Sequence, residues 1–315
     1  MNDSAADTTS GSGSGPAAPD PREPRPAPMA GPRRSTGPED ALGTWRELTA
    51  SASRSTAAGA AEGAEVEAAA GAPPAQLVLL DGFHALKHAV RFGAHVPVAL
   101  TADRESALAL AAELAPDVLG PLNALLVEVP EDALRGLVPR LHPTAVAALA
   151  VRPRRTENLA ALARLPRRAP VVLLDDPRNL GNAGAVIRLA AGFGVTGVVT
   201  TGTVDPWHPT VVRGGAGLHF ATAVERVDVA ALPPGPLFAL DPEGRDIRRM
   251  HLPDDAVLAF GSERSGLSAE VRERATHLVS LPMRPQVSSY NLATSVAMTL
   301  FHWSTGSASA PPATG

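Results

Sequence analysis

The sequence predicts an α/β protein with two domains, preceded by a low-complexity N-terminal tail. Short apolar runs alternate along the chain with helical segments, which is the pattern of strands joined by helices. In the C-terminal half these runs are almost continuously apolar, as expected for a parallel sheet that helices cover on both faces. With 315 residues, 44% of them hydrophobic, the chain is long enough to bury two cores.

Both ends of the chain are predicted to be disordered. Residues 1–72 are rich in Gly, Ser, Pro, Ala and charged residues, and such a composition cannot bury enough apolar surface to offset the entropy of ordering. Within this region only Trp45 and Leu48 indicate a possible short helix. Residues 304–315 are rich in Ser, Gly and Pro, and they form the second predicted tail.

Residues 73–151 are predicted to form a small α/β domain. Four apolar runs predict its strands, at 77–82, 96–100, 124–129 and 145–151. The segments 83–93 and 103–114 predict helices, and Gly93 is placed to end the first of them.

The next segment, 152–168, is predicted to connect the two domains. It contains one or two amphipathic turns and six arginines: Arg152, Arg154, Arg155, Arg164, Arg167 and Arg168. Such a charge run is typical of a solvated linker helix, but it also suits contact with nucleic-acid phosphates. Both interpretations stay open at this point.

Residues 169–303 predict the second domain. Its strands are expected at 170–176, 197–202, 236–241, 256–263 and 277–283, and a strongly apolar helix is expected at 289–303. In open parallel sheets, ligands bind beyond the carboxyl ends of the strands. The loops that follow three of these strands therefore indicate where a functional site lies.

Composition excludes several classes of function. The chain has no cysteine, which rules out disulfides, thiolate catalysis and Cys-based metal sites. The nine histidines show no metal-ligand spacing, so no metal is expected. No apolar stretch is long enough for a membrane span or signal core, so we expect a cytoplasmic protein without a membrane partner. The net charge of −4 argues against a broad nucleic-acid surface, although local patches can override it.

The first of the three loops, "DDPRNLGNAGAVIRLAAGFGV" at 175–195, leads into a helix that is apolar except at Arg188. Asn182 is expected before this helix as its N-cap, and Gly181 and Gly184 allow close backbone approach. A permanently charged guanidinium in an apolar helix needs a partner. That partner is a ligand phosphate, exposed carbonyls or an acid; the candidate acids are Asp175, Asp176 and Glu263.

The second and third loops are individually less specific. The second, "GSERSG" at 261–266, follows an apolar strand, where a Gly-rich turn cradles a ligand or simply connects two elements. The third, "LPMRPQVSSYN" at 281–291, ends with Ser289 and Asn291, which suit the N-cap of the apolar helix after them.

Taken together, the three loops resemble the TrmH/SpoU family of SPOUT methyltransferases. The resemblance covers about residues 170–303 and includes the segment 205–220, which is similar to a Pro-x-x-x-Arg-x-x-x-Gly region of the family. Asn182, Gly184 and Arg188 match the first motif, N-x-G-x-x-x-R. Gly261, Glu263 and Gly266 match the second, and the third is matched by Leu281, Pro282, Met283, Ser289 and Asn291. Two departures stand out: Tyr290 replaces a leucine, and Asn179 is an alternative to Asn182.

The resemblance implies a trefoil-knot domain that binds S-adenosylmethionine, forms a homodimer and methylates a ribose 2'-hydroxyl of tRNA or rRNA. The first domain is similar to the L30e-like substrate-binding domain of the family. Catalytic roles are implied for Asn182, Arg188, Glu263, Ser289 and Asn291, with Glu263 orienting Arg188. Cofactor contacts are implied for Thr200, Gly202, Gly261, Leu281, Met283 and Tyr290. RNA contacts are expected from Arg152, Arg154, Arg155 and Arg213.

Two other functions are compatible with parts of this pattern. A Rossmann dehydrogenase also has strand, Gly-rich loop and helix units, but no strand here is followed by G-x-G-x-x-G with a later acidic residue. A non-catalytic RNA-binding relative with a degenerate SPOUT fold is the alternative that the sequence leaves open.

Overall fold

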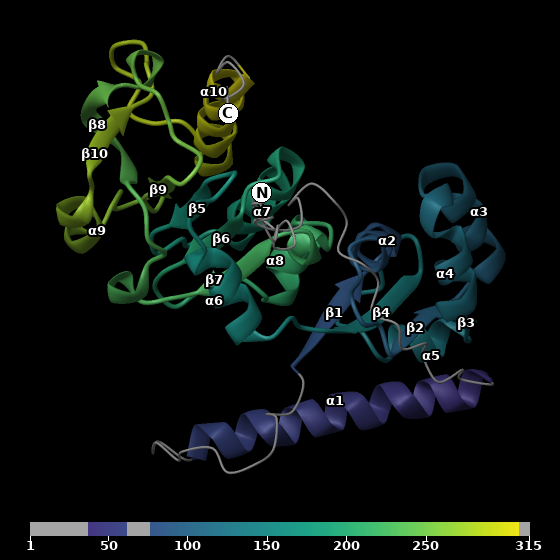
Figure 1. The fold of residues 1–315 in the computed structure, drawn as a ribbon. Helices are drawn as coiled ribbons and strands as arrows, with labels where there is room; N and C mark the ends of the chain where they lie inside the picture. The colour runs from purple at the N-terminus through teal and green to yellow at the C-terminus, as the bar shows by residue number, and fades with distance from the viewer. Residues whose placement is uncertain (1–36, 62–75, 309–315) are drawn as a thin grey trace, which may run out of the picture.

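The computed structural model describes residues 37–61 and 76–308, which contain two β-sheets with helices around them (Figure 1). One sheet lies within 77–151 and the other within 171–280. The α/β class and the parallel sheet expected in the C-terminal half are confirmed. The predicted domain boundaries at 73, 151 and 169 fall between elements of the two sheets and stay predictions.

The first sheet has four strands in the order β1-β4-β2-β3. β4 pairs antiparallel with β1 and β2, whereas β2 and β3 are parallel. The strands are β1 (Leu77–Asp81), β2 (Val98–Thr101), β3 (Leu126–Glu128) and β4 (Val146–Val151). The helices are α2 (Phe83–Arg91), α3 (Arg104–Leu114), η1 (Pro116–Val118), α4 (Leu119–Leu125) and α5 (Glu131–Arg135). The predicted elements are therefore present, except that the start of the run at 124–129 belongs to α4.

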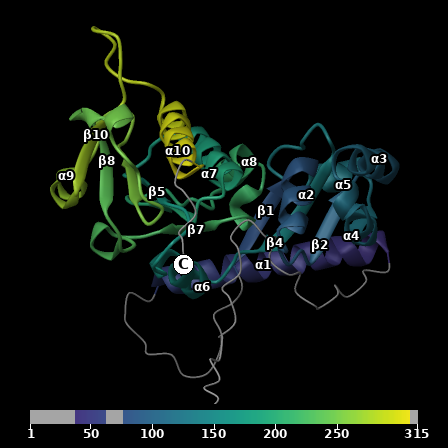
Figure 2. The same ribbon diagram turned by 45° about the horizontal axis from the view of Figure 1, so that its top comes forward.

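The structure corrects the prediction of a disordered tail through residue 72. Pro38–Ala61 form the helix α1, which lies against the strands of the first sheet (Figures 1 and 2). Ala41, Leu42 and Trp45 are almost fully buried against one face of that sheet. An apolar sheet face that would otherwise meet water stabilises this helix, so composition alone was misleading here. The rest of the predicted tail, 1–36 and 62–72, lies outside the described residues.

The second sheet has six strands, all parallel, in the order β10-β8-β9-β5-β6-β7. Its strands are β5 (Val171–Leu174), β6 (Gly197–Thr200), β7 (Ala223–Arg226), β8 (Leu237–Asp246), β9 (Val257–Phe260) and β10 (His277–Ser280). The helical elements are α6 (Arg155–Ala163), α7 (Leu180–Phe193), α8 (Pro209–Gly214), η2 (Leu218–Phe220), η3 (Val229–Ala231), η4 (Ile247–Arg249), α9 (Ala269–Arg274) and α10 (Leu292–Ala308). The sequence did not predict β7, because Glu225 interrupts its short apolar pattern.

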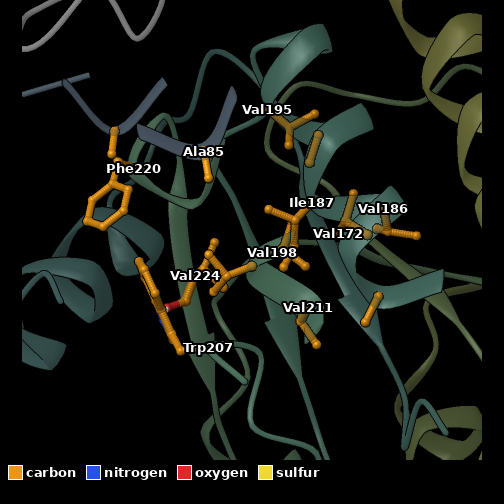
Figure 3. Close-up of a cluster of buried hydrophobic side chains, with 14 of the residues drawn as sticks. Ala85, Val172, Val186, Ile187, Val195, Val198, Trp207, Val211, Phe220 and Val224 are labelled. Carbon is orange, nitrogen blue, oxygen red and sulfur yellow. Dashed lines mark hydrogen bonds between the residues drawn. The ribbon is translucent and has the colours of Figure 1, made fainter. Parts of the chain in front are cut away.

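Alternate residues of these strands face opposite sides of the sheet, and both sides are buried. Val172, Val198 and Val224 pack with Val186 and Ile187 of α7 on one side, as Figure 3 shows. Residues on the other side form a separate core beneath α6 and α9. Burial on both faces explains why the strands read as continuous apolar runs instead of alternating with polar residues.

The two domains share one continuous hydrophobic core through α2. Ala85 of α2 lies in the same buried cluster as Phe220 and Val198 of the second domain (Figure 3). A Cβ at Gly217 would come within 2.4 Å of the main-chain oxygen of Ala85, so only glycine allows the two backbones to lie this close. The imidazole Nδ1 of His88 also contacts the carbonyl oxygen of Ala216, at 2.8 Å. Packing therefore holds α2 against the second domain.

Two further segments differ from the predictions. The Arg-rich segment 152–168 is folded onto the second sheet: α6 contacts β7, and Leu162 is buried in the core beneath it. The C-terminal helix α10 continues to Ala308, so residues 304–308 are helical and not part of the predicted tail; residues 309–315 lie outside the described part of the chain. In the connecting segment, the apolar Leu162 is what packs on the sheet.

Candidate active site

The three loops singled out by sequence follow β5, β9 and β10, at the carboxyl edge of the parallel sheet. β5 and β9 are neighbours in the sheet, while the chain passes from β5 through α7 to β6 on the opposite side of β5. The strand order therefore reverses between β5 and β9. A crevice at such a reversal is the usual ligand site of open α/β sheets.

The start of α7 is capped by Asn179. The Asn179 side-chain oxygen accepts a hydrogen bond from the main-chain N–H of Asn182 at 3.0 Å. Asn182 is thus the third residue of the helix, and the expectation that it precedes and caps the helix is wrong. Since Asn179 satisfies the free N–H groups of the first turn, the side chain of Asn182 is left available for other contacts.

Asn182 uses those contacts to connect all three loops. Its Nδ2 donates to Oε1 of Glu263 at 2.7 Å, and its Oδ1 accepts from Nδ2 of Asn291 at 3.1 Å. Asn291 in turn caps α10, because its Oδ1 accepts from the N–H of Ala293. The residues Glu263, Asn182 and Asn291 therefore form one hydrogen-bonded chain across the carboxyl edge of the sheet.

Glu263 is held as a carboxylate within this chain. Burial by itself would raise the pKa of Glu263, but hydrogen bonds from Asn182 and from main-chain groups, including those of Arg178 and Asn179, outweigh it and lower the pKa. An ionised Glu263 accepts hydrogen bonds only. It therefore fixes the orientation of the Asn182 amide, with the nitrogen toward Glu263 and the oxygen toward Asn291.

Arg188 lies apart from this chain. It is exposed on α7 and makes no hydrogen bond or ion pair with any residue in 37–61 or 76–308. None of the acids named as its candidate partners, Asp175, Asp176 and Glu263, is paired with it. The structure therefore corrects the expectation that Glu263 orients Arg188: the carboxylate orients Asn182. Arg188 instead faces α2 of the first domain, where its charge contributes to lowering the pKa of His84.

A second network under the site was missed by sequence reasoning. The buried carboxylate of Asp175 accepts hydrogen bonds from the Thr201 hydroxyl, at 2.7 Å, and from the main-chain N–H of Ser268, at 2.6 Å. Thr201 Oγ1 also accepts from the N–H of Asp176. The network ties the ends of β5 and β6 to the loop after β9. A polar residue directly after each of two neighbouring strands was the signal that could have revealed it.

Glycines in the loops serve backbone packing. A Cβ at Gly184 would lie 2.6 Å from the carbonyl oxygen of Val211, so this glycine lets α7 and α8 approach closely, as predicted. At Gly261 the implied contact with a cofactor stays a prediction, and the glycine also serves the packing of its own loop. A Cβ there would lie 2.1 Å from the carbonyl carbon of Gly266, within the turn that the two-way backbone pairing of Ser262 and Gly266 closes.

The cofactor candidates occupy two places at the same edge. Thr200 is fully buried at the end of β6, and its hydroxyl has no hydrogen-bond partner in the described structure. Gly202 follows in the loop, with a φ of 72°. In the third loop, the main-chain amides of Leu281, Met283 and Tyr290 donate no hydrogen bond to any described residue. Groups left free in this way can bind a ligand through the main chain.

Tyr290 contacts its own loop directly. Its hydroxyl donates to the carbonyl oxygen of Pro282 at 3.0 Å, which joins the two ends of the loop. Ser289, beside it, is exposed and has no hydrogen-bond partner among the described residues. The tyrosine that departs from the family pattern therefore shapes the loop, whereas the position of Ser289 leaves its hydroxyl free.

The arginines expected to bind RNA are mostly engaged within the protein. Arg152 and Arg155 both contact the fully buried carboxylate of Glu225, at 3.2 and 3.0 Å, and Arg213 pairs with the buried Asp81 of the first domain. Arg154 is exposed and lies 3.9 Å from Glu157. Arg152 and Arg155 therefore join the connecting segment to β7, and Arg213 joins α8 to the first domain.

Two other kinds of feature are absent from the described residues. No group of three or more His, Asp or Glu side chains is arranged to hold a metal ion in the parts of the chain at 37–61 and 76–308. Nor does any helix of those parts combine the length and the apolar character that crossing a membrane requires.

The fold and the convergence of three strand-end loops define a parallel α/β domain with a ligand site at its carboxyl edge. Residues 169–301 match the sequence profile of the SpoU rRNA Methylase family. This segment of the chain is therefore similar to the SpoU rRNA Methylase family.

Individual relatives agree with this assignment. The chain is 35% identical over 139 residues to an uncharacterized tRNA/rRNA methyltransferase of Synechocystis, covering 41% of this chain and 49% of the relative. It is 31% identical over 144 residues to the 23S rRNA (uridine(2479)-2'-O)-methyltransferase of Streptomyces viridochromogenes, covering 41% and 50%. The match thus spans about half the length of these curated relatives.

A solved structure extends the similarity to more of the chain. The SpoU methyltransferase AviRb of Streptomyces viridochromogenes, in complex with the cofactor AdoMet, superposes with a TM-score of 0.60 at 25% identity. The superposition covers 74% of this chain and 91% of AviRb. That share exceeds the domain at 169–301, so the similarity includes residues of the first domain as well.

Proposed function

We propose that this protein is an RNA ribose 2'-O-methyltransferase that uses S-adenosylmethionine. The observation that carries the proposal is the hydrogen-bonded chain of Glu263, Asn182 and Asn291, which brings the three motif loops together at the carboxyl edge of the sheet. The relatives named as methyltransferases of 23S rRNA ribose, and AviRb with its bound AdoMet, support this reaction class. Among RNAs, we favour rRNA over tRNA because these relatives modify rRNA.

The residues present fit the proposed cofactor. The unpaired amides of Leu281, Met283 and Tyr290 and the orphaned hydroxyl of Thr200 are the kinds of groups that would hold it. When bound, S-adenosylmethionine would supply an activated methyl group for the ribose 2'-oxygen. Gly202 and Gly261 shape the turns beside these groups.

The side chains of the site have separate roles in the proposal. Glu263 orients the Asn182 amide, and Asn182 and Asn291 keep the first and third loops in register to position the ribose. Arg188 stays ionised and binds a substrate phosphate, polarising the 2'-hydroxyl rather than accepting its proton. Ser289, with its free hydroxyl, is assigned to contact the ribose.

Four further parts of the proposal come from the family resemblance. The knot, the homodimer, the cytoplasmic location and the L30e-like nature of the first domain remain predictions. The homodimer is supported by Phe301, whose side chain is 63% exposed on α10 while Val296 and Leu300 of the same helix are buried. A large exposed apolar side chain on such a helix is a feature of interfaces.

The proposal is tested by transfer of labelled methyl from S-adenosylmethionine to total tRNA and rRNA from cells lacking this protein. We expect label in one RNA, with nuclease mapping placing it at one ribose 2'-oxygen. Label on a base, or no transfer to any RNA by a protein that binds the cofactor, would contradict the proposed reaction. Absence of cofactor binding would favour the non-catalytic RNA-binding alternative.

A further inference from the structure

Lys87 is the only lysine in a chain that otherwise uses arginine for its strong cations. It lies on α2, with 9% of its surface exposed, where the first domain meets the second. Its ammonium makes no hydrogen bond or ion pair with the residues that the structure describes. The ammonium nitrogen is not one of the buried, unpaired polar atoms, so it is the aliphatic stem that is buried while the charge reaches the surface without a counter-ion among the described residues.

The charged groups around Lys87 are mostly positive. Burial and the charges of Arg91 and Arg188 lower the pKa of the Lys87 ammonium, which the negative charge of Asp117 only partly opposes. Asp117 is already engaged, because both of its carboxylate oxygens accept hydrogen bonds from Arg91, at 2.7 and 2.6 Å. Lys87 is therefore left among like charges.

His84 completes the group. It precedes Lys87 by three residues on α2, so both side chains lie on the same face of the helix. Burial, followed by the charges of Lys87, His142 and Arg188, lowers the pKa of His84. The helix α2, which carries His84 and Lys87, and the helix α7, which carries Arg188, both pack against η2, and the charge of Arg188 contributes to both pKa shifts. We call these three residues the interdomain cation cluster.

We propose that the interdomain cation cluster binds one phosphate of the RNA backbone, so that both domains hold the same strand. Lys87 and Arg188 supply the positive charges, and His84 supplies a ring N–H donor. The proposal rests on the proposed function, since it identifies how the RNA substrate reaches that site. It also differs from the earlier assignment of RNA contacts to the connecting segment, whose arginines already pair with Glu225.

The position of the cluster suits a strand that enters the candidate active site. Asn182 and Arg188 are six residues apart on α7, which corresponds to about 9 Å along the helix axis. The phosphate held by the cluster is taken to be the one next to the target ribose, since Arg188 is also assigned to polarise the 2'-hydroxyl of that ribose. RNA is favoured over a small anion because the cluster lies beside this site and is shared by two domains.

The test measures how binding of unmodified 23S rRNA transcript depends on salt, by filter binding of the full-length protein. Lys87→Met keeps the aliphatic stem and removes the charge. We expect its affinity to fall about tenfold at low salt and the slope of log K against log salt to decrease by roughly 0.7 to 0.9. Arg135→Met, which removes an exposed cation of α5 in the same domain, is the matched control and should leave both quantities unchanged.

A double variant tests whether the cations share one phosphate. Lys87→Met combined with Arg188→Met should lose less affinity than the sum of the two single losses in free energy, because each contact depends on the other. Full additivity would overturn the shared site. A slope for Lys87→Met equal to that of the control would overturn the role of Lys87.

Acetylation of the unaltered protein supplies a readout that no folding defect can affect. Lys87 is the single ε-amine, and the α-amine of the chain serves as the internal reference. Bound rRNA should slow acetylation of Lys87 at least fivefold relative to the α-amine at low salt, and high salt should remove the protection. Unchanged acetylation in the presence of bound rRNA would overturn the proposal.

The outcomes separate this proposal from the proposed function. Methyl transfer by the unaltered protein together with an unchanged salt slope for Lys87→Met overturns only the phosphate site. If Lys87→Met lowers the salt slope and bound rRNA protects Lys87 from acetylation, but no RNA is methylated, only the enzymatic function is overturned.

Discussion

Two groups of cations lie near the domain boundary, and they differ in their partners. In the connecting segment, Arg152 and Arg155 share the buried carboxylate of Glu225, which also accepts a hydrogen bond from Asn158. In the interdomain cation cluster, neither Lys87 nor Arg188 forms an ion pair with a carboxylate of the described residues. The arginine-rich segment looks more like an RNA contact in the sequence, yet it is the one whose charge is neutralised. Partners, rather than the number of cations, distinguish a structural group from a binding one.

The first prediction tests the structural group and has the largest expected effect. Glu225→Gln removes the buried carboxylate that Arg152 and Arg155 share and leaves Arg152 only Asp205, at 3.6 Å. Because Arg155 is half exposed, we expect a loss of about 3 kcal/mol in the free energy of unfolding, the low end for breaking a buried pair. Chemical denaturation measures the loss. Glu131→Gln, which affects an exposed pair with Arg135, should cost under about 1 kcal/mol. Equal effects of the two variants would remove the distinction between the groups.

The second prediction concerns His219, which is fully buried beside the connecting segment and packs at a tilt against Trp207, with ring centroids 5.0 Å apart. Burial lowers its pKa from 6.5 to about 4. As pH falls from 6.5 to 4, the unfolded chain binds a proton that the folded protein does not, so folding loses up to about 3 kcal/mol.

Unfolding free energies measured between pH 7 and pH 4 check this effect. The decline should be shallower for His219→Gln, which keeps a donor for the carbonyl of Pro206, and unchanged for the exposed His251→Gln. Parallel curves for His219→Gln and the unaltered protein would show that another group causes the decline.

The third prediction tests the binding group through the reaction. Arg188→Lys keeps the charge but loses the planar set of donors that holds phosphate, so kcat/KM for methyl transfer should fall about 100-fold, while cofactor affinity stays the same. Arg155→Lys, a change of the same kind in the connecting segment, should alter kcat/KM less than threefold. Near-normal turnover of Arg188→Lys would exclude a role for its guanidinium.

The smallest effect on stability is expected at the start of α7. Asn179→Ala removes the N-cap and should cost about 1 kcal/mol of the free energy of unfolding, with methyl transfer largely retained. Asn182→Ala should show the opposite pattern, because its side chain contacts Glu263 and Asn291 instead of the helix end. The reverse result would make Asn179 the motif asparagine.

Much of the site could be predicted because the relevant residues lie in the loops and helix starts that follow strands. Asn182, Glu263 and Asn291 come from three segments separated by 81 and 28 residues, yet the carboxyl edge of one parallel sheet brings them together. What the sequence could not reveal is which contacts each side chain makes. Asn179 caps the helix, Glu263 contacts Asn182 instead of Arg188, and the Asp175, Thr201 and Ser268 network was missed.

The sequence by itself determined the α/β class, the parallel sheet and the three loops, because strand burial and turn chemistry are local patterns along the chain. The tertiary structure decided that residues 38–61 form the ordered helix α1 and that Glu225 pairs with the arginines of the connecting segment. It also decided that Lys87 of the first domain lies near Arg188 of the second. Each of these depends on which surfaces pack together across the two domains. A polar residue's partner is set by that packing, and no periodicity in the sequence records it.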